Sequence, residues 1–522
     1  MTTELVKLKI DGVDVEVPKG TNLLEAAKSA EIEVPYFCYH PGLSSPAVCR
    51  QCLVAVKGMP KLVPACYTPV SEGMEVTTSS PQVLTARRQM LEFTLVNHPV
   101  DCPICDKAGE CHLQKLYQEW DHKASRLDLV KVRKDKVVDV GPHIVLDQER
   151  CILCSRCIRV CNEVARAPQL TMARRGDREI LTTAPGQALD NAYSINTVDV
   201  CPVGALTAKD FRFSMRAWEL SATPSVCNGC STGCNVEVHT SKGRIHRLVP
   251  RHNAEVNQYW MCDEGRFTYK LVHEGRLAVS RLSGKPAAYD AVLGEAAGKL
   301  EAMVAKSGAS VGLVLTADMV NEDAYALRTL AVDHLRIGRT YVVGSPPVPE
   351  RDDKILRTAD INANSRGVRA IAGPGAAGAA ELAADLRGGA LKALIVLGND
   401  LPGVMDALSG LELLVVLGTH DGELARAATF VLPIAAWAEV DATITNKDGR
   451  TQRLRQALPP PGAVRPGWRV VRDLARRSGA AMEHADARAV FAELQSRVVD
   501  FAGAEFGRDV APFSLRFAGS RG

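Results

Sequence analysis

The chain has sixteen cysteines, and they are the residues most able to do chemistry. All of them lie between Cys38 and Cys262. Residues 263–522 contain none. The first ten residues alternate in charge and lack the apolar core of a secretion signal. Clustered cysteines in such a chain are more often metal ligands than disulfide partners. The N-terminal half therefore uses thiolates for a task that the C-terminal half does not share.

The first group of cysteines predicts a binuclear iron–sulfur site. Four thiolates, three of them in one loop, can hold two irons, so we expect a [2Fe–2S] cluster, with a zinc site as the alternative. Upstream, alternating residues flank Asp11-Gly12, which predicts a hairpin, and Thr21 is placed to cap a short helix over 23–27. Together these features favour a β-grasp ferredoxin over residues 1–80. The group, spaced C-x10-C-x2-C-x13-C, consists of Cys38, Cys49, Cys52 and Cys66.

The second group offers only three thiolates, and it lies in a segment, residues 81–122, whose apolar spacing predicts helix. A tetranuclear cluster needs four protein ligands. His98, four residues before the first cysteine, is the preferred fourth ligand. His112 competes, but it adjoins a ligand cysteine, which makes joint ligation of one compact cluster awkward. The expected set, H-x3-C-x2-C-x5-C, is His98, Cys102, Cys105 and Cys111.

The third group begins with C-x2-C-x2-C-x3-C, the bacterial ferredoxin pattern, in the loop-rich residues 140–215. In two-cluster ferredoxins the fourth cysteine of this pattern serves the other cluster, and a second full set is missing here. We therefore expect one [4Fe–4S] cluster completed by a remote cysteine, with Cys161 left over as a small buried thiol. The expected ligands are Cys151, Cys154, Cys157 and Cys201.

The fourth group, spaced C-x2-C-x3-C-x27-C, predicts a further [4Fe–4S] cluster, and short strands are expected near it at 236–239 and 247–249. Zinc ribbons pair CxxC with CxxC, whereas these sets are asymmetric, which favours one [2Fe–2S] and three [4Fe–4S] clusters over zinc. Several clusters in one chain indicate serial one-electron transfer, and a histidine ligand should raise the potential of its cluster. The ligands expected for this fourth cluster are Cys227, Cys230, Cys234 and Cys262.

The C-terminal half has a different amino-acid composition, rich in Ala, Gly, Leu and Val. Continuous apolar runs alternate with helical stretches, which predicts a parallel α/β sheet covered on both faces. The expected fold class is thus α+β followed by α/β. The predicted strands include residues 311–315, 341–343, 393–397 and 413–417.

The four spacings, in this order, resemble the large iron–sulfur subunit (the G subunit) of the proton-pumping NADH:quinone oxidoreductase, respiratory complex I. The stretch 191–205 resembles that family around the fourth ligand of its third cluster, and residues 430–446 and 449–453 resemble its molybdopterin-oxidoreductase-type domain. The resemblance covers essentially the whole chain. It implies these modules: a [4Fe–4S] module with one histidine and three cysteine ligands at 81–122, a [4Fe–4S] ferredoxin-like module at 140–215, a [4Fe–4S] Mo/W bis-MGD-type domain at 222–276, and a truncated molybdopterin-oxidoreductase-like α/β domain, expected to lack metal, at 277–522.

The resemblance also implies a path for electrons. They would arrive from the flavin-bearing, NADH-oxidising subunits and pass through the binuclear cluster, the Cys151-type cluster and the His98 cluster. They would leave to a ferredoxin-like [4Fe–4S] subunit near the quinone. The Cys227-type cluster would lie off this path, with a structural role. NADH oxidation, quinone reduction and proton translocation would belong to other subunits, so no bond-making residue is expected here.

The expected location is the peripheral arm, on the cytoplasmic side of the inner (plasma) membrane. No apolar run approaches the length of a membrane span, so attachment would run through other subunits. The formal charge of +3 gives no case for nucleic acid.

The sequence also allows functions other than an electron relay. A molybdopterin-dependent, formate dehydrogenase-like catalytic subunit is the main alternative, although such enzymes usually place cysteine or selenocysteine on molybdenum. An iron-only hydrogenase would need cysteines after Cys262, and there are none. The stretch Gly373–Gly378 fits G-x-G-x-x-G, but a tight strand-to-helix turn is the better interpretation than dinucleotide binding. The neighbours His420 and Asp421 are expected to be structural.

Overall fold

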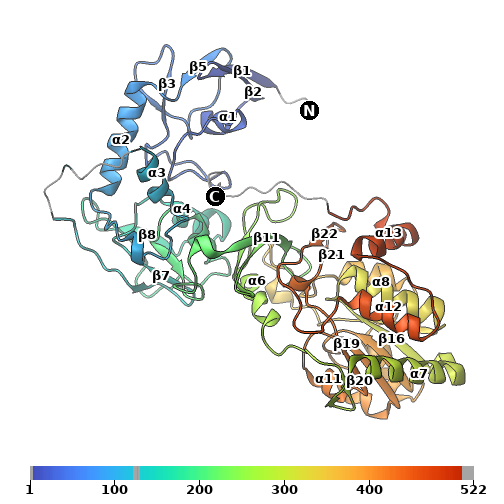
Figure 1. Ribbon diagram of the computed structural model, residues 1–522. Helices are drawn as coiled ribbons and strands as arrows, with labels where there is room; N and C mark the ends of the chain where they lie inside the picture. Colours follow the sequence, from blue (N-terminus) through green and yellow to red (C-terminus); the bar gives the residue numbers. More distant parts are fainter. Residues whose placement is uncertain (1–3, 121–125, 127–129, 508–522) are drawn as a thin grey trace. The chain divides into compact units, whose positions relative to one another are not determined.

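The computed structural model describes residues 4–120, 126 and 130–507 (Figure 1). The chain divides into two compact units, residues 1–219 and 220–522. Parts of three expected modules lie outside the described residues, namely 1–3, 121–122 and 508–522. Among the helices that are described, none combines the length and the hydropathy that a membrane span requires.

Unit 1 opens with a five-stranded sheet in the order β2-β1-β5-β3-β4. The expected hairpin is confirmed, and its two turn residues, Asp11 and Gly12, both have positive φ, as a type I′ turn requires. The expected cap is wrong, because the side chain of Asn22 caps the helix while Thr21 pairs through its backbone with Pro18. The elements are β1 Leu5–Ile10, β2 Val13–Pro18, α1 Leu23–Ser29, β3 Leu53–Val56, β4 Val63–Pro64 and β5 Met74–Thr77.

The expected helix over 81–122 is interrupted. Helices α2 (Pro81–Leu95) and α3 (His112–Trp120) flank a loop that contains only one 3-10 turn, Cys102–Ile104. Prolines at 99 and 103 and a glycine with positive φ, Gly109, break the helical pattern there. The loop bears three of the cysteines of unit 1, Cys102, Cys105 and Cys111.

The rest of unit 1 consists of short elements around the third cysteine group. A small sheet has the order β10-β7-β6, and a separate hairpin pairs β8 with β9. Helix α4 runs directly into a π-helical segment, Val160–Val164. The elements are β6 Val138–Asp139, β7 Ile144–Leu146, α4 Arg156–Arg159, β8 Leu170–Ala173, β9 Ile180–Thr183, α5 Asn196–Val200 and β10 Leu206–Ala208.

Unit 2 begins with an antiparallel sheet of β11 (Ser221–Val226), β12 (Asn235–Ser241) and β13 (Arg244–Pro250). The last two contain the short strands expected at 236–239 and 247–249. A one-turn helix, α6 (Asp263–Arg266), follows. The turn between β11 and β12 and the start of α6 carry the fourth cysteine group.

A seven-stranded sheet in the order β15-β14-β20-β19-β18-β16-β17 forms the centre of unit 2. Its five strands from β20 to β17 are parallel, which confirms the prediction from the apolar runs. Two short strands, β21 and β22, form a hairpin outside this sheet. The strands are β14 Arg281–Leu282, β15 Lys285–Pro286, β16 Val311–Thr316, β17 Arg339–Val343, β18 Ala393–Leu397, β19 Leu413–Gly418, β20 Phe430–Pro433, β21 Ala442–Thr445 and β22 Thr451–Leu454.

Helices cover both faces of this sheet, which explains why its strands are apolar throughout. One face packs with α7, α8, α12 and α13, and the other with α10 and α11. The helices of unit 2 are α7 Tyr289–Ser307, α8 Asn321–Arg328, α9 Ser365–Ala372, α10 Ala379–Arg387, α11 Glu423–Ala427, α12 Gly467–Arg477 and α13 Ala487–Arg497.

The G-x-G-x-x-G stretch, which lies wholly within the described residues, does not follow a strand. It joins α9 to α10, so the expected strand-to-helix turn is wrong, because residues 365–372 bury one helical face through Val368 and Ile371. The Gly378 N–H donates to the Glu381 carboxylate at 3.2 Å and is already used as a helix cap. A dinucleotide fingerprint requires a strand where the structure has α9.

Candidate metal centres

The first cysteine group comes from two segments of the β-grasp unit, because Cys38, Cys49 and Cys52 lie between α1 and β3 and Cys66 follows β4. Cys38, Cys52 and Cys66 are buried, and Cys49 is half-buried. The backbone N–H groups of Phe37 and Cys38 both donate to Cys49 Sγ at 3.4 Å. The pKa of the Cys49 thiol lies well above its usual value, chiefly because the thiol forms a hydrogen bond with Cys38 and is buried. Neighbouring sulfurs that receive backbone N–H groups are suited to hold and tune an iron–sulfur cluster.

The third group shares one small cavity. Four thiols line it together with apolar side chains from β8, β9 and β10, and Cys161 is not among them. Burial raises the pKa of the Cys151 and Cys154 thiols to about 12. A bare thiolate is costly in such surroundings, so positive iron would be needed to stabilise it. The four lining cysteines are Cys151, Cys154, Cys157 and Cys201.

Cys161 has separate surroundings. Its side chain is fully buried on the π-helical segment after α4. Burial raises the pKa of its thiol to about 12, although a hydrogen bond with Asn191 opposes the shift. These contacts fit the expected small buried thiol.

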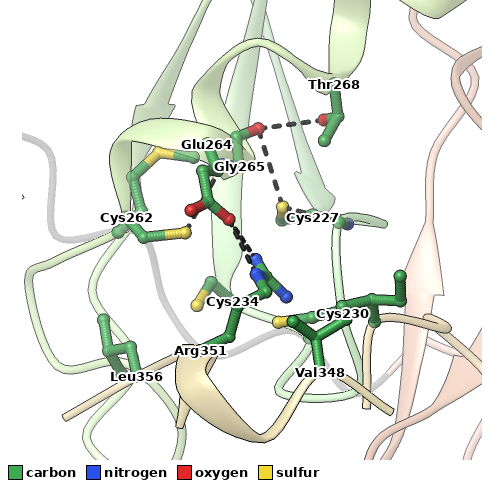
Figure 2. A pocket seen from close by; sticks show the side chains of 14 residues that line it. Cys227, Cys230, Cys234, Cys262, Glu264, Gly265, Thr268, Val348, Arg351 and Leu356 are labelled. Carbon is green, nitrogen blue, oxygen red and sulfur yellow. Dashed lines mark hydrogen bonds and ion pairs between the residues drawn. The ribbon is translucent and has the colours of Figure 1, made fainter. Parts of the chain in front are cut away.

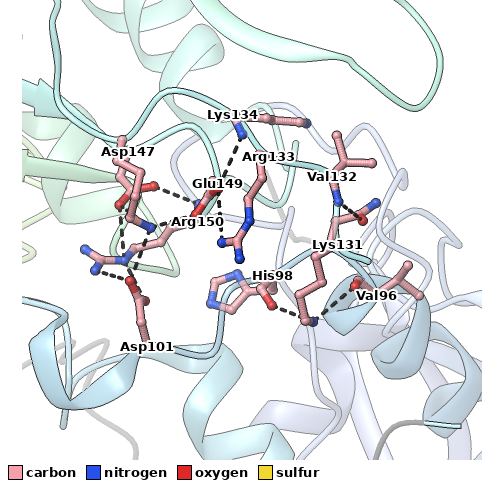
Figure 3. A network of polar contacts seen from close by, with 12 residues as sticks. Val96, His98, Asp101, Lys131, Val132, Arg133, Lys134, Asp147, Glu149 and Arg150 are labelled. Carbon is pink, nitrogen blue, oxygen red and sulfur yellow. Dashed lines mark hydrogen bonds and ion pairs between the residues drawn. The ribbon is translucent and has the colours of Figure 1, made fainter. Parts of the chain in front are cut away.

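The second group lies on the loop between α2 and α3. Cys102 raises the pKa of Cys105, and Cys105 in turn raises the pKa of Cys111. Each thiol is therefore close enough to the next to interact with it electrostatically. An ion-paired network borders them, in which Arg150 donates to Asp101 at 2.9 Å and 2.6 Å (Figure 3). The pKa values of both Cys105 and His98 respond to Asp101 and Arg150. His98 and Cys105 therefore border the same charged pair.

His98 has the properties of a neutral ligand. Burial lowers its pKa to about 4, so the ring is uncharged at neutral pH and has a lone pair to offer. Its Nδ1 is buried and has no hydrogen-bond partner among the described residues. The Lys131 ammonium fixes its backbone by donating to the His98 carbonyl at 2.8 Å (Figure 3). His112 is also buried and its pKa is likewise lowered, and its backbone N–H donates to Pro202.

Arg159 joins the first group to the third. Its guanidinium donates to the carbonyl of Cys38 and, at 3.4 Å, to that of Cys154. It also donates to the Ser44 carbonyl, while the Glu163 carboxylate accepts from the Ser44 N–H at 2.8 Å. A buried cation thus bridges two cysteine loops that are more than a hundred residues apart in the sequence.

Gly204 joins the third group to the second. It follows Cys201 by three residues, and a Cβ placed on it would lie 2.2 Å from Cys105 Sγ. The His112 N–H, directly after Cys111, donates to the Pro202 carbonyl at 2.9 Å. Any side chain at position 204 would therefore have to displace Cys105 Sγ.

Replacing Gly204 with alanine is expected to displace Cys105 Sγ and to weaken or abolish metal binding by the second group. Gly375→Ala is the matched control, because no atom lies within 4 Å of its added Cβ. Iron content and low-temperature EPR of the reduced protein would compare the two variants. An unchanged spectrum for Gly204→Ala would contradict the close approach to Cys105.

The fourth group surrounds a cavity with a volume of about 350 Å³ (Figure 2). Gly229 and Gly265 donate N–H groups to Cys227 and Cys262 Sγ, each at 3.4 Å. Arg351, paired with Glu264, lies close enough for the thiols to raise its pKa. The space exceeds what one metal ion needs, and the donor set fits a tetranuclear cluster. The thiols that line it are those of Cys227, Cys230, Cys234 and Cys262.

Among the described residues, no three His, Cys, Asp or Glu side chains converge so as to hold a single metal ion. His420 and Asp421 do not form an acid–base pair. The His420 Nε2 contacts the Leu271 carbonyl at 2.7 Å, and Asp421 pairs with Arg281.

Sequence reasoning did not find Arg159, Gly204 or Arg351. Gly204 carried a signal, because a glycine three residues after a ligand cysteine can mark close approach to a sulfur. The two arginines carried none, because their partners come from distant parts of the sequence.

Five family matches follow the chain in order. Residues 3–81 match a 2Fe-2S iron–sulfur cluster binding domain, and residues 87–126 match the NADH-ubiquinone oxidoreductase-G iron–sulfur binding region. Residues 141–207 match the ferredoxin-like domain of NADH-quinone oxidoreductase subunit 3. Residues 220–274 match the molybdopterin oxidoreductase Fe4S4 domain, and residues 357–477 match molybdopterin oxidoreductase. These matches show 2Fe-2S and 4Fe-4S binding domains followed by a molybdopterin-oxidoreductase-type domain, and they confirm the expected fold class.

The resemblance to the large iron–sulfur subunit is confirmed by relatives of that name. The NADH-quinone oxidoreductase G subunit of Streptomyces coelicolor is 39% identical over 336 residues, which is 63% of this chain and 39% of that protein. The NADH-ubiquinone oxidoreductase 75 kDa subunit of Reclinomonas americana is 36% identical, over 69% of this chain and 53% of that protein. The alpha subunit of an NADPH-Fe(3+) oxidoreductase of Geobacter sulfurreducens is also 36% identical, over 62% and 39%. The chain thus spans about half or less of the length of these relatives.

A chain in the crystal structure of an NAD+-reducing [NiFe]-hydrogenase in the H2-reduced state is similar over 40% of this chain and 90% of that chain. The identity is 29% and the TM-score is 0.37.

Proposed function

We propose that this chain conducts electrons one at a time as the large iron–sulfur subunit of an NADH:quinone oxidoreductase. The observation that carries the proposal is the contact between three cysteine groups in unit 1. Arg159 bridges the first and third groups, and Gly204 packs against Cys105 of the second. Groups in contact keep the separation between successive redox centres short, which single-electron transfer needs.

The ligand sets follow from the donors described above, for one [2Fe–2S] and three [4Fe–4S] clusters. When bound, each cluster would supply a centre that accepts and releases a single electron. The proposed sets are Cys38, Cys49, Cys52 and Cys66 for the binuclear cluster, and His98, Cys102, Cys105 and Cys111, then Cys151, Cys154, Cys157 and Cys201, then Cys227, Cys230, Cys234 and Cys262 for the tetranuclear clusters.

The protein residues tune and insulate the path. Buried apolar side chains around the third group exclude water, and N–H groups aimed at sulfur stabilise negative charge. Arg159 holds a positive charge between two groups that become more negative on reduction. No residue of the chain needs to make or break a bond to carbon or hydrogen.

The proposed partners follow from the relatives' names and the resemblance. Electrons would enter from flavin-bearing, NADH-oxidising subunits and leave to a ferredoxin-like [4Fe–4S] subunit. The chain would belong to the peripheral arm on the cytoplasmic side of the membrane. The fourth group and residues 277–522 would serve structure and subunit packing.

Metal analysis with low-temperature EPR of the anaerobically purified, dithionite-reduced chain tests the proposal. One binuclear and three tetranuclear signals without molybdenum are expected. A sulfide-free zinc protein would contradict any redox function. Stoichiometric molybdenum would instead support the alternative, a molybdopterin-dependent formate dehydrogenase-like catalytic subunit. The match of residues 357–477 to molybdopterin oxidoreductase is the reason to test for it.

Replacing Arg159 with glutamine is expected to lower the reduction potentials of both neighbouring clusters by roughly 50–100 mV, from the Coulomb energy of one charge at an effective dielectric near 20. Burial lowers the pKa of Arg159, while Cys154 and Cys38 oppose that shift, so the guanidinium lies close to both groups. Arg159→Lys keeps the charge and is the control. EPR-monitored redox titration measures both potentials. Equal values in the wild type and Arg159→Gln would exclude an electrostatic role.

A further inference from the structure

Arg87, on helix α2, carries one of the most deeply buried charges of unit 1. Its side chain is only 1% exposed, although it is among the largest of the fully buried side chains. Its Nη2 has no hydrogen-bond partner, and no carboxylate of the described residues hydrogen-bonds to its guanidinium. Burying a cation without a counter-ion costs free energy, so a buried arginine of this kind is retained where another negative group compensates it.

Hydrogen bonds from Arg87 hold the chain on both sides of Cys52. The Arg87 Nε donates to the Leu53 carbonyl at 3.1 Å, and the Arg87 carbonyl accepts from Gln51 Nε2 at 3.3 Å. Gln51 is itself only 1% exposed, so water does not compete for this contact. Helix α2 therefore fixes the backbone on either side of a thiol of the first cysteine group.

An aromatic ring covers the guanidinium without neutralising it. The Arg87 guanidinium carbon lies 5.6 Å from the ring centre of Trp120, at the end of α3. A cation–π contact stabilises a positive charge through the electron-rich face of the ring and leaves that charge in place. Since the ring itself carries no charge, the field of Arg87 still acts on its other neighbours.

Cys52 is the group that attracts this charge most strongly. Burial lowers the pKa of Arg87 to about 10, and Cys52, more than Asp11, opposes the shift. The guanidinium is therefore charged at neutral pH and lies within electrostatic range of the first group. Asp11 is already bound elsewhere, because its carboxylate accepts from the Thr78 N–H at 2.7 Å. Four thiolates around two irons carry net negative charge, which would supply the counter-charge that Arg87 lacks.

We propose that Arg87 is a positioning residue that raises the reduction potential of the binuclear cluster, by holding an uncompensated positive charge beside Cys52 and by fixing the backbone around this ligand. The proposal rests on the proposed function, since it requires a redox-active cluster on the first group. Reduction adds one electron to that cluster, and a nearby positive charge stabilises the reduced state more than the oxidised state. The cation would thus make the first group a better electron acceptor.

EPR-monitored redox titration of the full chain, with dithionite as the reductant, tests this role. Arg87→Gln should lower the equilibrium constant for reduction of the binuclear cluster by about tenfold, which is about 59 mV for one electron. Arg87→Lys keeps the charge and should retain most of the wild-type potential. Arg88→Gln is the matched control, because it removes a charge from an exposed neighbour on the same helix and should leave the potential unchanged.

The three variants together separate an electrostatic role from a purely structural one. Loss of the binuclear signal in Arg87→Gln, with the signal and potential kept in Arg87→Lys, would still support the proposal, because only the charge is shared with the wild type. Equal potentials in the wild type and Arg87→Gln, an equal shift in Arg88→Gln, or loss of the signal in Arg87→Lys as well would overturn it. A wild-type chain without any binuclear signal would instead overturn the proposed function.

Discussion

Replacing Cys201 with alanine is expected to remove the third cluster, so that the purified chain carries about four irons fewer than the wild type. Cys201 lines the cavity together with Cys151, Cys154 and Cys157, and its side chain is only 8% exposed. Water cannot easily replace a lost ligand in such apolar surroundings. The remaining three thiolates would hold at most a labile cluster that is lost during purification. Iron and sulfide analysis with EPR of oxidised and reduced samples measures the change.

Cys161→Ala is the matched control for this experiment. Both cysteines are buried in the same hydrophobic cluster, but Cys161 does not line the cavity. Its removal should leave the iron content unchanged and cost about 1 kcal/mol of folding free energy through a small void. Loss of the cluster in Cys161→Ala, with Cys201→Ala intact, would assign the fourth ligand to Cys161 instead.

Replacing His98 with alanine is expected to abolish the second cluster's EPR signal, because three thiolates then remain. His98→Cys should keep a cluster but lower its reduction potential, since a thiolate brings one more negative charge than a neutral imidazole. The lowered pKa of about 4 means that the wild-type ring is neutral across the physiological range. Redox titration of the two variants beside the wild type gives the signal and its potential.

His112→Gln tests the competing assignment. His112 begins α3 next to Cys111, and its backbone N–H donates to Pro202. A glutamine keeps that backbone contact, so the second cluster's signal should survive. A signal that disappears in His112→Gln and persists in His98→Ala would make His112 the ligand.

Local patterns predicted much of the fold. The alternation around Asp11-Gly12 gave the hairpin, and the apolar runs gave the parallel strands β16 to β19, because periodicity reflects which side chains must be buried. The errors lie where a local signal was overridden. Asn22 rather than Thr21 caps α1, and residues 96–111 leave the helical pattern to form a cysteine-bearing loop.

The arrangement of the sites depended on features that no spacing contains. Leu153 and Ser155 adopt φ of +54° and +58° in the loop between Cys151 and Cys157, although neither is a glycine. Such conformations cost free energy in isolation and persist because the surrounding structure enforces them. A single sequence gives no indication of this strain.

By itself, the sequence determined which residues could bind iron and how they group, because thiolate chemistry and ligand spacing are local properties of the chain. Only the tertiary structure decided that Gly204 lies against Cys105 and that Arg159 spans two cysteine loops. These relations join residues that are distant in the sequence. They arise from the packing of whole elements, which residue spacing does not encode.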